Sequence, residues 1–108
     1  MCLFCKIIDG DIPNKTILEN DNFLAFEDIN PMAKIHVLII PKVHIKSFNE
    51  MTPNIMAEMT IFIQEVALSL GVKNDGYRLI TNIGQNGGQE VAHLHFHLLA
   101  GEQLGGII

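Results

Sequence analysis

The sequence predicts an α+β domain in which one long helix packs on a mostly antiparallel five-stranded sheet, with a short helix near the N-terminus. Five segments have the β-branched content or the two-residue alternation of strands, whereas only one segment carries a long helical pattern. The connections are short, and only the one that holds the long helix could join a parallel pair. A chain of 108 residues with 48% hydrophobic content fits a single domain, residues 1–108.

The first half of the chain supplies the short helix and three strands. A helical turn is predicted over residues 4–9, because Gly10 can end it in a left-handed conformation. Residues 16–19 and 22–28 are expected to pair as a hairpin around an Asn-Asp turn. Residues 34–41, KIHVLIIP, are rich in β-branched side chains and form a predicted strand that ends at its proline.

The second half begins with the long helix, predicted over residues 53–70. Thr52 is suited to cap its N-terminus, a proline occupies its first position, and Gly71 follows its end. Most of its apolar side chains form one stripe, but Ile61 and Leu68 lie outside that stripe. We therefore expect this helix to be covered on more than one side.

Two further strands are predicted over residues 77–83 and 92–100, joined by the loop GQNGGQEV. The last strand contains HLHFHLL, in which every second residue is a histidine. Successive side chains of a strand point to opposite faces, so the three imidazoles would share one face and the residues between them would fill a core. These histidines are His93, His95 and His97.

The charge balance argues against a nucleic-acid-binding protein. The net charge is −5, and the seven Lys and Arg residues form no cluster that could follow a phosphate backbone. No apolar run is longer than residues 37–40, and charged residues interrupt the N-terminus where a signal peptide would be apolar. We expect a cytoplasmic protein without a membrane or nucleic-acid partner.

Three imidazoles on one face can support two kinds of chemistry. A neutral imidazole can attack phosphorus and carry the phosphoryl group, while its neighbours hold the tautomer or donate to phosphate oxygens. Three imidazoles can instead bind Zn²⁺ and leave a fourth position for water. Chemistry alone leaves both open. His36 lies between two apolar residues and is interpreted as a hydrogen-bonded structural histidine outside the site.

The loop before the histidines has the composition of an anion-binding segment. Gly84, Gly87 and Gly88 allow the backbone to turn its N–H groups toward a phosphate. Asn82 and Gln89 add uncharged donors that can orient phosphate oxygens, although Asn82 could equally satisfy backbone groups. The loop and the histidine strand together predict phosphoryl or nucleotidyl chemistry.

Two cysteines, Cys2 and Cys5, form a C-x-x-C near the N-terminus. In a reducing cytosol this spacing favours a metal site or a redox pair over a structural disulfide. A pair of free thiols near a mobile chain end is the alternative.

The segment HLHFHLL has the form of the histidine-triad family, and longer blocks extend the resemblance over most of the chain. The sequence is similar to the Hint-type branch, the purine nucleoside phosphoramidases, and its similar blocks occur in the order found in that branch. The blocks are FCKIIDGDIP, LAFEDINPMAKIHVLIIPKVHI and GYRLITNIGQNGGQEVAHLHFHLLAG. The resemblance implies a homodimer, for which Ile61 and Leu68 are the predicted contacts.

The resemblance also implies an activity, namely hydrolysis of purine nucleoside 5′-phosphoramidates through a nucleotidyl-histidine intermediate, with no cofactor needed for the chemistry. Hydrolysis of dinucleoside polyphosphates, as in the Fhit-type branch, is one alternative, and a nucleotide-binding regulator with little turnover is another. In the phosphoramidase hypothesis, His95 would attack the α-phosphorus, and His97 would donate a hydrogen bond to the phosphate or the leaving group. His93 and His44 would support the nucleophile.

The resemblance further implies a nucleotide-binding site around these histidines. Asp28 would accept both ribose hydroxyls with Ile29 beside the sugar, although Asp28 taken alone is typical of a turn-capping residue. Three residues would hold the phosphate: Asn82, Gly88 and Gln89. Four apolar residues, which on spacing alone are typical of a core, would form the slot for the base: Phe4, Ile7, Phe26 and Leu3.

Some members of the family carry a C-x-x-C that binds zinc with two histidines. By position, the resemblance implies a structural zinc held by Cys2, Cys5, His44 and His93. Such a zinc excludes a proton relay through the same imidazoles, because their lone pairs would be committed to the metal. Glu90 stands where animal members have a serine near the scissile bond. The segments AGEQ and LGGII likewise depart from the Gly-Gly-Arg and the aromatic tail of those members.

Overall fold

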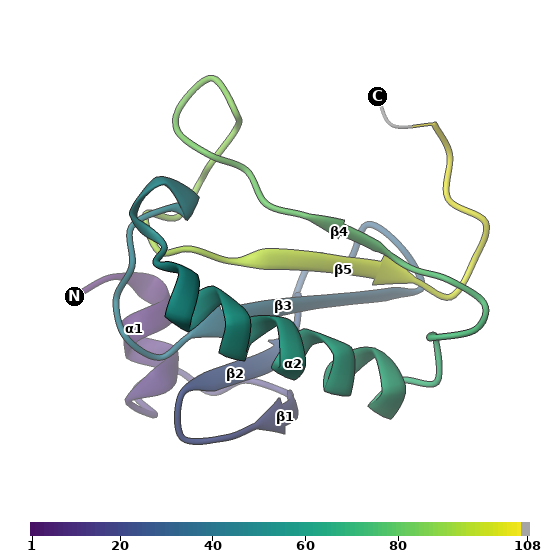
Figure 1. Ribbon diagram of the computed structural model, residues 1–108, viewed down its shortest axis with the longest axis horizontal. Coiled ribbons are helices and arrows are strands. Elements are labelled where there is room, and N and C mark those ends of the chain that lie inside the picture. The colour runs from purple at the N-terminus through teal and green to yellow at the C-terminus, as the bar shows by residue number, and fades with distance from the viewer. Residues whose placement is uncertain (107–108) are drawn as a thin grey trace.

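The computed structural model describes residues 1–106, so the last two residues of the predicted domain lie outside the described part. One sheet has the strand order β1-β2-β3-β5-β4, and every neighbouring pair is antiparallel, which confirms the predicted α+β class (Figure 1). The strands are β1 (Thr16–Glu19), β2 (Phe23–Glu27), β3 (Ile35–Pro41), β4 (Arg78–Ile80) and β5 (Phe96–Ala100). The helices are α1 (Leu3–Ile8) and α2 (Pro53–Ser69), with a 3-10 turn, η1, over Phe48–Glu50.

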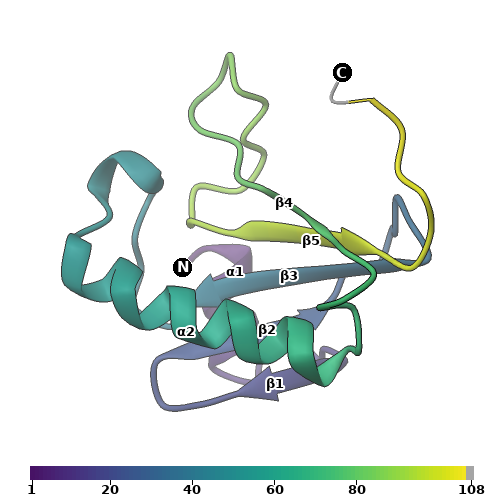
Figure 2. The same cartoon turned by 45° about the vertical axis from the view of Figure 1, so that its right-hand side comes forward.

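The two helices cover opposite faces of the sheet, with α2 along one face and α1 on the other (Figure 2). Alternate residues of β2 and β3 therefore enter two separate cores. The α2-side core holds Phe23, Ala25, Val37 and Ile39, packed with Phe62 and Val66 of the helix. The α1-side core holds Leu24, Phe26, Leu38 and Ile40, packed with Phe4 and Ile7. The nearly continuous apolar runs of both strands follow from this burial on two sides.

The long helix α2 is built as its local signals predict. The Thr52 hydroxyl accepts the N–H of Ile55 at 3.4 Å and caps the N-terminus. Gly71 follows the helix at φ +72°, a left-handed conformation in which a side chain would be strained. The face opposite the core leaves Ile61 and Leu68 59% and 66% exposed.

The last two strands are shorter than the predicted ranges 77–83 and 92–100. Ile39 of β3 pairs with Phe96, and two residues further along β3 is Pro41, which has no N–H to continue the ladder. The Thr81 hydroxyl instead donates to the His95 carbonyl at 2.8 Å, so a side chain replaces a backbone partner there. The histidine segment consequently enters β5 from a loop.

The remaining differences from the predicted elements are small. The helix α1 starts and ends one residue early, because the Sγ of Cys2 accepts the N–H of Cys5 at 3.2 Å and caps it. The turn η1 carries no strong sequence signal and was missed. Within residues 1–106, no helix combines the length and the apolar character needed to cross a membrane.

Candidate active site

The three triad histidines lie on the face of the sheet that carries α1, although only His97 belongs to β5. The ring centroids of His95 and His97 are 5.1 Å apart, and Phe4 of α1 meets His93 and His95 edge-on at 5.9 and 5.1 Å. On the other face, the residues between the histidines join the α2-side core: Leu94, Phe96 and Leu98. The alternation expected from the sequence is therefore kept in the loop that precedes the strand.

His95 has the hydrogen bonding that a nucleophilic imidazole needs. Its side chain is buried, and its Nδ1 lies 2.8 Å from the carbonyl oxygen of His93. Because a carbonyl oxygen only accepts, Nδ1 must carry a proton, and in the neutral form of the ring Nε2 keeps a free lone pair. An oriented ring with an unprotonated Nε2 can attack an electrophilic phosphorus.

His97 is flanked by His95 on one side and by His36 on the other. The Nδ1 of His97 lies 2.9 Å from the Nε2 of His36, and the two ring centroids are 5.2 Å apart. Burial, together with the smaller effects of the nearby rings of His95 and His36, lowers the pKa of His97 to about 4, while Asp28 opposes the shift. His97 is therefore neutral at pH 7 and acts as a hydrogen-bonding group, without a formal charge.

Asp28 uses its two carboxylate oxygens differently. Oδ1 accepts the N–H of Asn30 at 2.8 Å, which is the turn-capping bond expected of an aspartate in this position. Oδ2 lies 3.4 Å from the Nε2 of His36, so the carboxylate also reaches the histidine network. Ile29, the next residue, is almost fully exposed. Asp28 thus stands at the junction between the turn and the histidines.

His36 is the site residue that the sequence interpretation left out. It is buried and hydrogen-bonded, as expected, but its partners are the predicted site residues Asp28 and His97. The signal was present in the strand pattern, because His36 alternates with Leu38 and Ile40 on the α1 side of β3. Pairing β3 against β5 would then have placed His36 beside His97.

The residues predicted to form a base slot lie mostly in the α1-side core. Phe4 and Phe26 meet edge to face with ring centroids 5.7 Å apart, and Ile7 is buried in the same cluster. Leu3 is about half exposed. The structure therefore brings three of the four together as buried packing residues and leaves Leu3 at the surface.

The glycine-rich loop is held by side-chain amides. The Asn82 Nδ2 donates to the Gly87 carbonyl at 2.8 Å. The Gln89 Nε2 donates to two carbonyls, those of Lys46 and Val91, and its Oε1 accepts the N–H of Gly84 at 3.0 Å. Both amides thus stabilise the loop conformation, in which Gly88 adopts a left-handed φ of +81°.

An open hollow of about 610 Å³ lies between this loop and the segment that contains η1. Glu90 lines the hollow together with Gly88 and Gln89, and Lys46 and Glu50 lie across from them. None of the triad histidines is among its lining residues, although Ala92, the residue before His93, is one of them.

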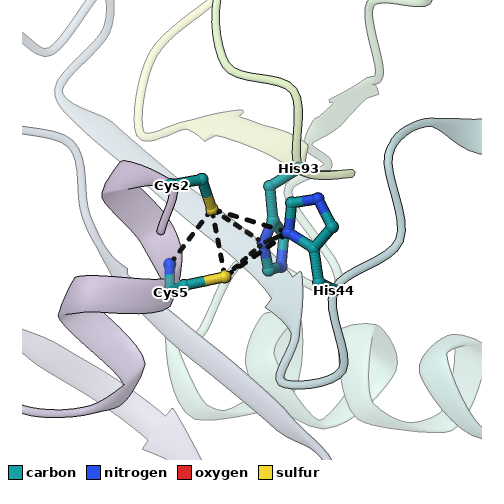
Figure 3. Close-up of side chains that lie close together, drawn as sticks. All are labelled: Cys2, Cys5, His44 and His93. Atoms are coloured by element: carbon teal, nitrogen blue, oxygen red, sulfur yellow. Dashed lines mark hydrogen bonds between the residues drawn. The ribbon is translucent and has the colours of Figure 1, made fainter.

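Four side chains from distant parts of the chain converge beside α1: Cys2, Cys5, His44 and His93 (Figure 3). The six distances between their Sγ and Nδ1 atoms lie between 3.1 and 3.6 Å. In a tetrahedral zinc site, bonds of about 2.3 Å to sulfur and about 2.0 Å to nitrogen place ligand atoms about 3.3 to 3.8 Å apart. Six nearly equal edges of this size fit zinc.

The surroundings of the cluster also suit a metal. The His93 Nε2–H donates to the Pro41 carbonyl at 2.8 Å, which leaves the Nδ1 lone pair facing the two sulfurs. Burial lowers the pKa of His93, whereas burial and the Cys2 thiol raise the pKa of Cys5. His93 is therefore already in its ligating form, and Cys5 would release a proton on binding a metal.

Comparison with known proteins connects this arrangement to a family. Residues 9–104 match the family model of the HIT domain. The chain belongs to the HIT domain family. The match contains every predicted site residue from Asp28 to His97, whereas α1 and both cysteines precede it. The five-stranded sheet with its two helices is accordingly the HIT fold.

The similar proteins match this chain over nearly its whole length. The chain is 58% identical over 103 residues to an uncharacterized HIT-like protein of Helicobacter pylori, covering 95% of this chain and 99% of the relative. It is 41% identical over 106 residues to the purine nucleoside phosphoramidase of Escherichia coli, and the match covers 95% of this chain and 89% of that relative. The crystal structure of a HIT family hydrolase from Legionella pneumophila superposes with a TM-score of 0.91 at 44% identity. The superposition covers 97% of this chain and 96% of that structure.

Proposed function

We propose that this HIT domain hydrolyses purine nucleoside 5′-phosphoramidates to a nucleoside monophosphate and an amine. The observation that carries the proposal is the position of two imidazoles: the Nδ1 of His95 faces the His93 carbonyl, which leaves its Nε2 for the substrate, and His97 lies directly beside it. The Escherichia coli relative, named a purine nucleoside phosphoramidase and 41% identical, supports the substrate class.

In the first half of the reaction, the Nε2 of His95 attacks the α-phosphorus and the P–N bond breaks. The nitrogen leaves with the electron pair of that bond and takes one proton from solvent, which releases the amine. The ring of His95, now bonded to phosphorus, carries a positive charge, and the His93 carbonyl that accepts its Nδ1–H stabilises that charge. His97 donates a hydrogen bond to the phosphoryl group or to the departing nitrogen.

In the second half, water attacks the same phosphorus and the bond to His95 breaks. The water loses one proton to solvent, which balances the proton taken up before, and His95 departs as the neutral ring it was at the start. The nucleoside monophosphate then leaves. Two displacements at one phosphorus replace a single difficult one, which is the advantage of a covalent intermediate.

The nucleotide is placed by the elements around the triad. In this proposal Asp28 accepts the ribose hydroxyls beside Ile29, and the buried Phe4, Ile7 and Phe26 form the floor of the base site with Leu3 at its exposed edge. The loop residues act on the phosphate by shaping the backbone next to it, because their amides are engaged there: Asn82, Gly88 and Gln89. Glu90 faces the hollow where the leaving amine would lie.

We further propose that Cys2, Cys5, His44 and His93 hold a structural zinc. A bound zinc would have all four positions filled by protein, so it would supply rigidity and leave the phosphoryl chemistry to His95. His93 would then support the nucleophile through its carbonyl, while its ring and that of His44 bind the metal. The zinc would tie α1 to the loop that leads into β5.

A homodimer completes the proposal. Ile61 and Leu68 are exposed on α2 and line a hollow of about 440 Å³ that also includes Tyr77 and Ala67. Exposed apolar side chains that gather around a concave surface are typical of an interface. We place the protein in the cytoplasm, where the C-x-x-C cysteines stay reduced.

The test is to incubate the purified protein separately with adenosine 5′-phosphoramidate and with a diadenosine polyphosphate, and to follow AMP release by chromatography. The proposal predicts fast release from the phosphoramidate and slow release from the dinucleotide. Preference for the dinucleotide would replace the phosphoramidase by a dinucleoside polyphosphate hydrolase. Tight AMP binding without turnover of either would indicate a nucleotide-binding regulator.

A further inference from the structure

The backbone of His95 lies just beyond the paired part of β5. On one side, the pairing of β4 with β5 ends at Ile80, which faces His97. On the other side, the pairing of β3 with β5 ends at Ile39, which faces Phe96. A main chain outside the ladder needs hydrogen bonds from other groups to fix its position. The place of the attacking imidazole therefore depends on those other bonds.

The half-buried Thr81, the first residue after β4, supplies one of them. Its hydroxyl donates to the His95 carbonyl at 2.8 Å. We propose that Thr81 is a positioning residue, which sets the place of the His95 imidazole relative to the glycine-rich loop. The inference rests on the proposed function for its reaction, whereas the hydrogen bond is a property of the fold.

The other bonds of this segment do not attach His95 to the loop. The Nδ1–H of His95 bonds the carbonyl of His93, only two residues earlier, so it orients the ring within the segment. The N–H of Leu94 donates to the Ile45 carbonyl at 2.6 Å, which attaches the segment on the side where β3 ends. The Thr81 bond attaches it on the opposite side, where β4 ends.

The position of Thr81 in the chain connects the nucleophile to the phosphate site. The next residue is Asn82, whose Nδ2 donates to the Gly87 carbonyl and stabilises the glycine-rich loop. Attack on phosphorus requires the reacting atoms to lie about 3 to 3.5 Å apart and in line with the leaving group. The loop shapes the phosphate site, and Thr81 bonds the nucleophile's backbone to the start of the same loop. The separation of the two is thereby kept constant.

The test removes the hydroxyl and then restores it. Thr81→Val keeps the branched shape without the donor, Thr81→Ala removes the donor without adding a methyl group, and Thr81→Ser keeps the hydroxyl. Thr60→Val is the matched control, because the Thr60 hydroxyl also donates to a backbone carbonyl at 2.8 Å, that of Met56 in α2. For each protein, kcat and KM are measured with adenosine 5′-phosphoramidate well below the recorded unfolding temperature.

We expect kcat to fall about 10-fold or more in Thr81→Val and Thr81→Ala, with KM within about threefold of the wild type, because the bound substrate meets a displaced nucleophile. Thr81→Ser should keep kcat within about threefold of the wild type, and Thr60→Val should leave kcat and KM unchanged. A purely structural role for Thr81 would lower the unfolding temperature without separating kcat from KM.

NMR tests the same inference without turnover. In the wild type, the Thr81 hydroxyl proton should exchange slowly with solvent, and the ¹⁵N signals of the His95 ring should shift or broaden in Thr81→Val but not in Thr60→Val. A rapidly exchanging hydroxyl would overturn the inference. So would a folded Thr81→Val or Thr81→Ala protein with wild-type kcat, or a Thr81→Ser protein as slow as Thr81→Val. Failure of the proposed function is a separate outcome, because a wild-type protein that cleaves no phosphoramidate still gives these NMR signals.

Discussion

At the scale of single residues, the proposed chemistry depends most on one lone pair, that of the His95 Nε2. His95→Ala removes it, and we expect the release of AMP from a phosphoramidate to slow by several decades, on the order of 5 kcal/mol of barrier or more. Ile12→Ala, which trims a partly buried residue beside the same core, should keep near-normal turnover and controls for loss of packing. A His95→Ala protein within about tenfold of the wild-type rate would reject the nucleophile assignment.

His97 should also make the stability of the protein depend on pH. Its pKa is lowered from 6.5 to about 4 on folding, so between these values the unfolded chain binds a proton that the folded chain does not. The free energy of unfolding therefore falls as the pH falls through this window, by about 2 kcal/mol on reaching pH 5. Urea unfolding at pH 7.5 and pH 5.0 measures the loss, and His97→Gln should reduce it. An equal loss in both proteins would contradict the assignment to His97.

At the scale of elements, α1 is the one that depends most on its surroundings. Its six residues are too few for a stable isolated helix, so its position rests on Phe4 and Ile7 in the core and on the cysteine–histidine cluster.

Cys2→Ser should therefore abolish zinc binding, measured by elemental analysis of protein purified without a metal-affinity step, and lower the unfolding temperature by several degrees. Leu3→Ser alters a half-exposed residue of the same helix and should keep the metal. A wild-type protein that contains no zinc would exclude the site.

The glycine-rich loop is the second such element, and Gly87 is its tightest point. A Cβ at Gly87 would lie 2.2 Å from the Ile83 carbonyl oxygen, so Gly87→Ala must displace backbone that Asn82 holds in place. We expect turnover of the phosphoramidate to fall by about tenfold or more, with overpacking of about 1 to 3 kcal/mol. Gly105→Ala is the matched control, because nothing lies within 4 Å of its Cβ. Equal activity of the two variants would show that the loop conformation does not matter.

At the scale of the whole molecule, the question is how the exposed face of α2 is covered. If two copies associate there, Leu68→Lys should convert a dimer into a monomer by placing two charges in an apolar interface. Ser69→Lys adds the same charge at the neighbouring exposed position, outside the hollow, and should leave the dimer intact. Light scattering at micromolar concentration distinguishes the two states, and a monomeric wild type would contradict the interface.

Much of the fold could be read from local signals. The helix α2 is bounded by a capping threonine and a following glycine that act within a few residues of its ends, so its limits were predicted to within one residue. The β-branched and apolar content of β2 and β3 indicated that these segments are strands, and the spacing of the histidines predicted that the triad shares one face. The ends of β4 and β5 were predicted too long, because strand ends depend on a partner that a single segment does not reveal.

The sequence by itself determined which residue types could do phosphoryl chemistry and the family in which they occur. Only the tertiary structure decided how those residues are used. His36 meets His97 across 61 positions, and Cys2 meets His93 across 91, so no local pattern encodes either contact. The same holds for Gln89, whose Nε2 donates a hydrogen bond to the Lys46 carbonyl in a distant segment. A hydrogen bond forms only between groups that the packed sheet brings within about 3 Å, and the sheet is a property of the whole chain.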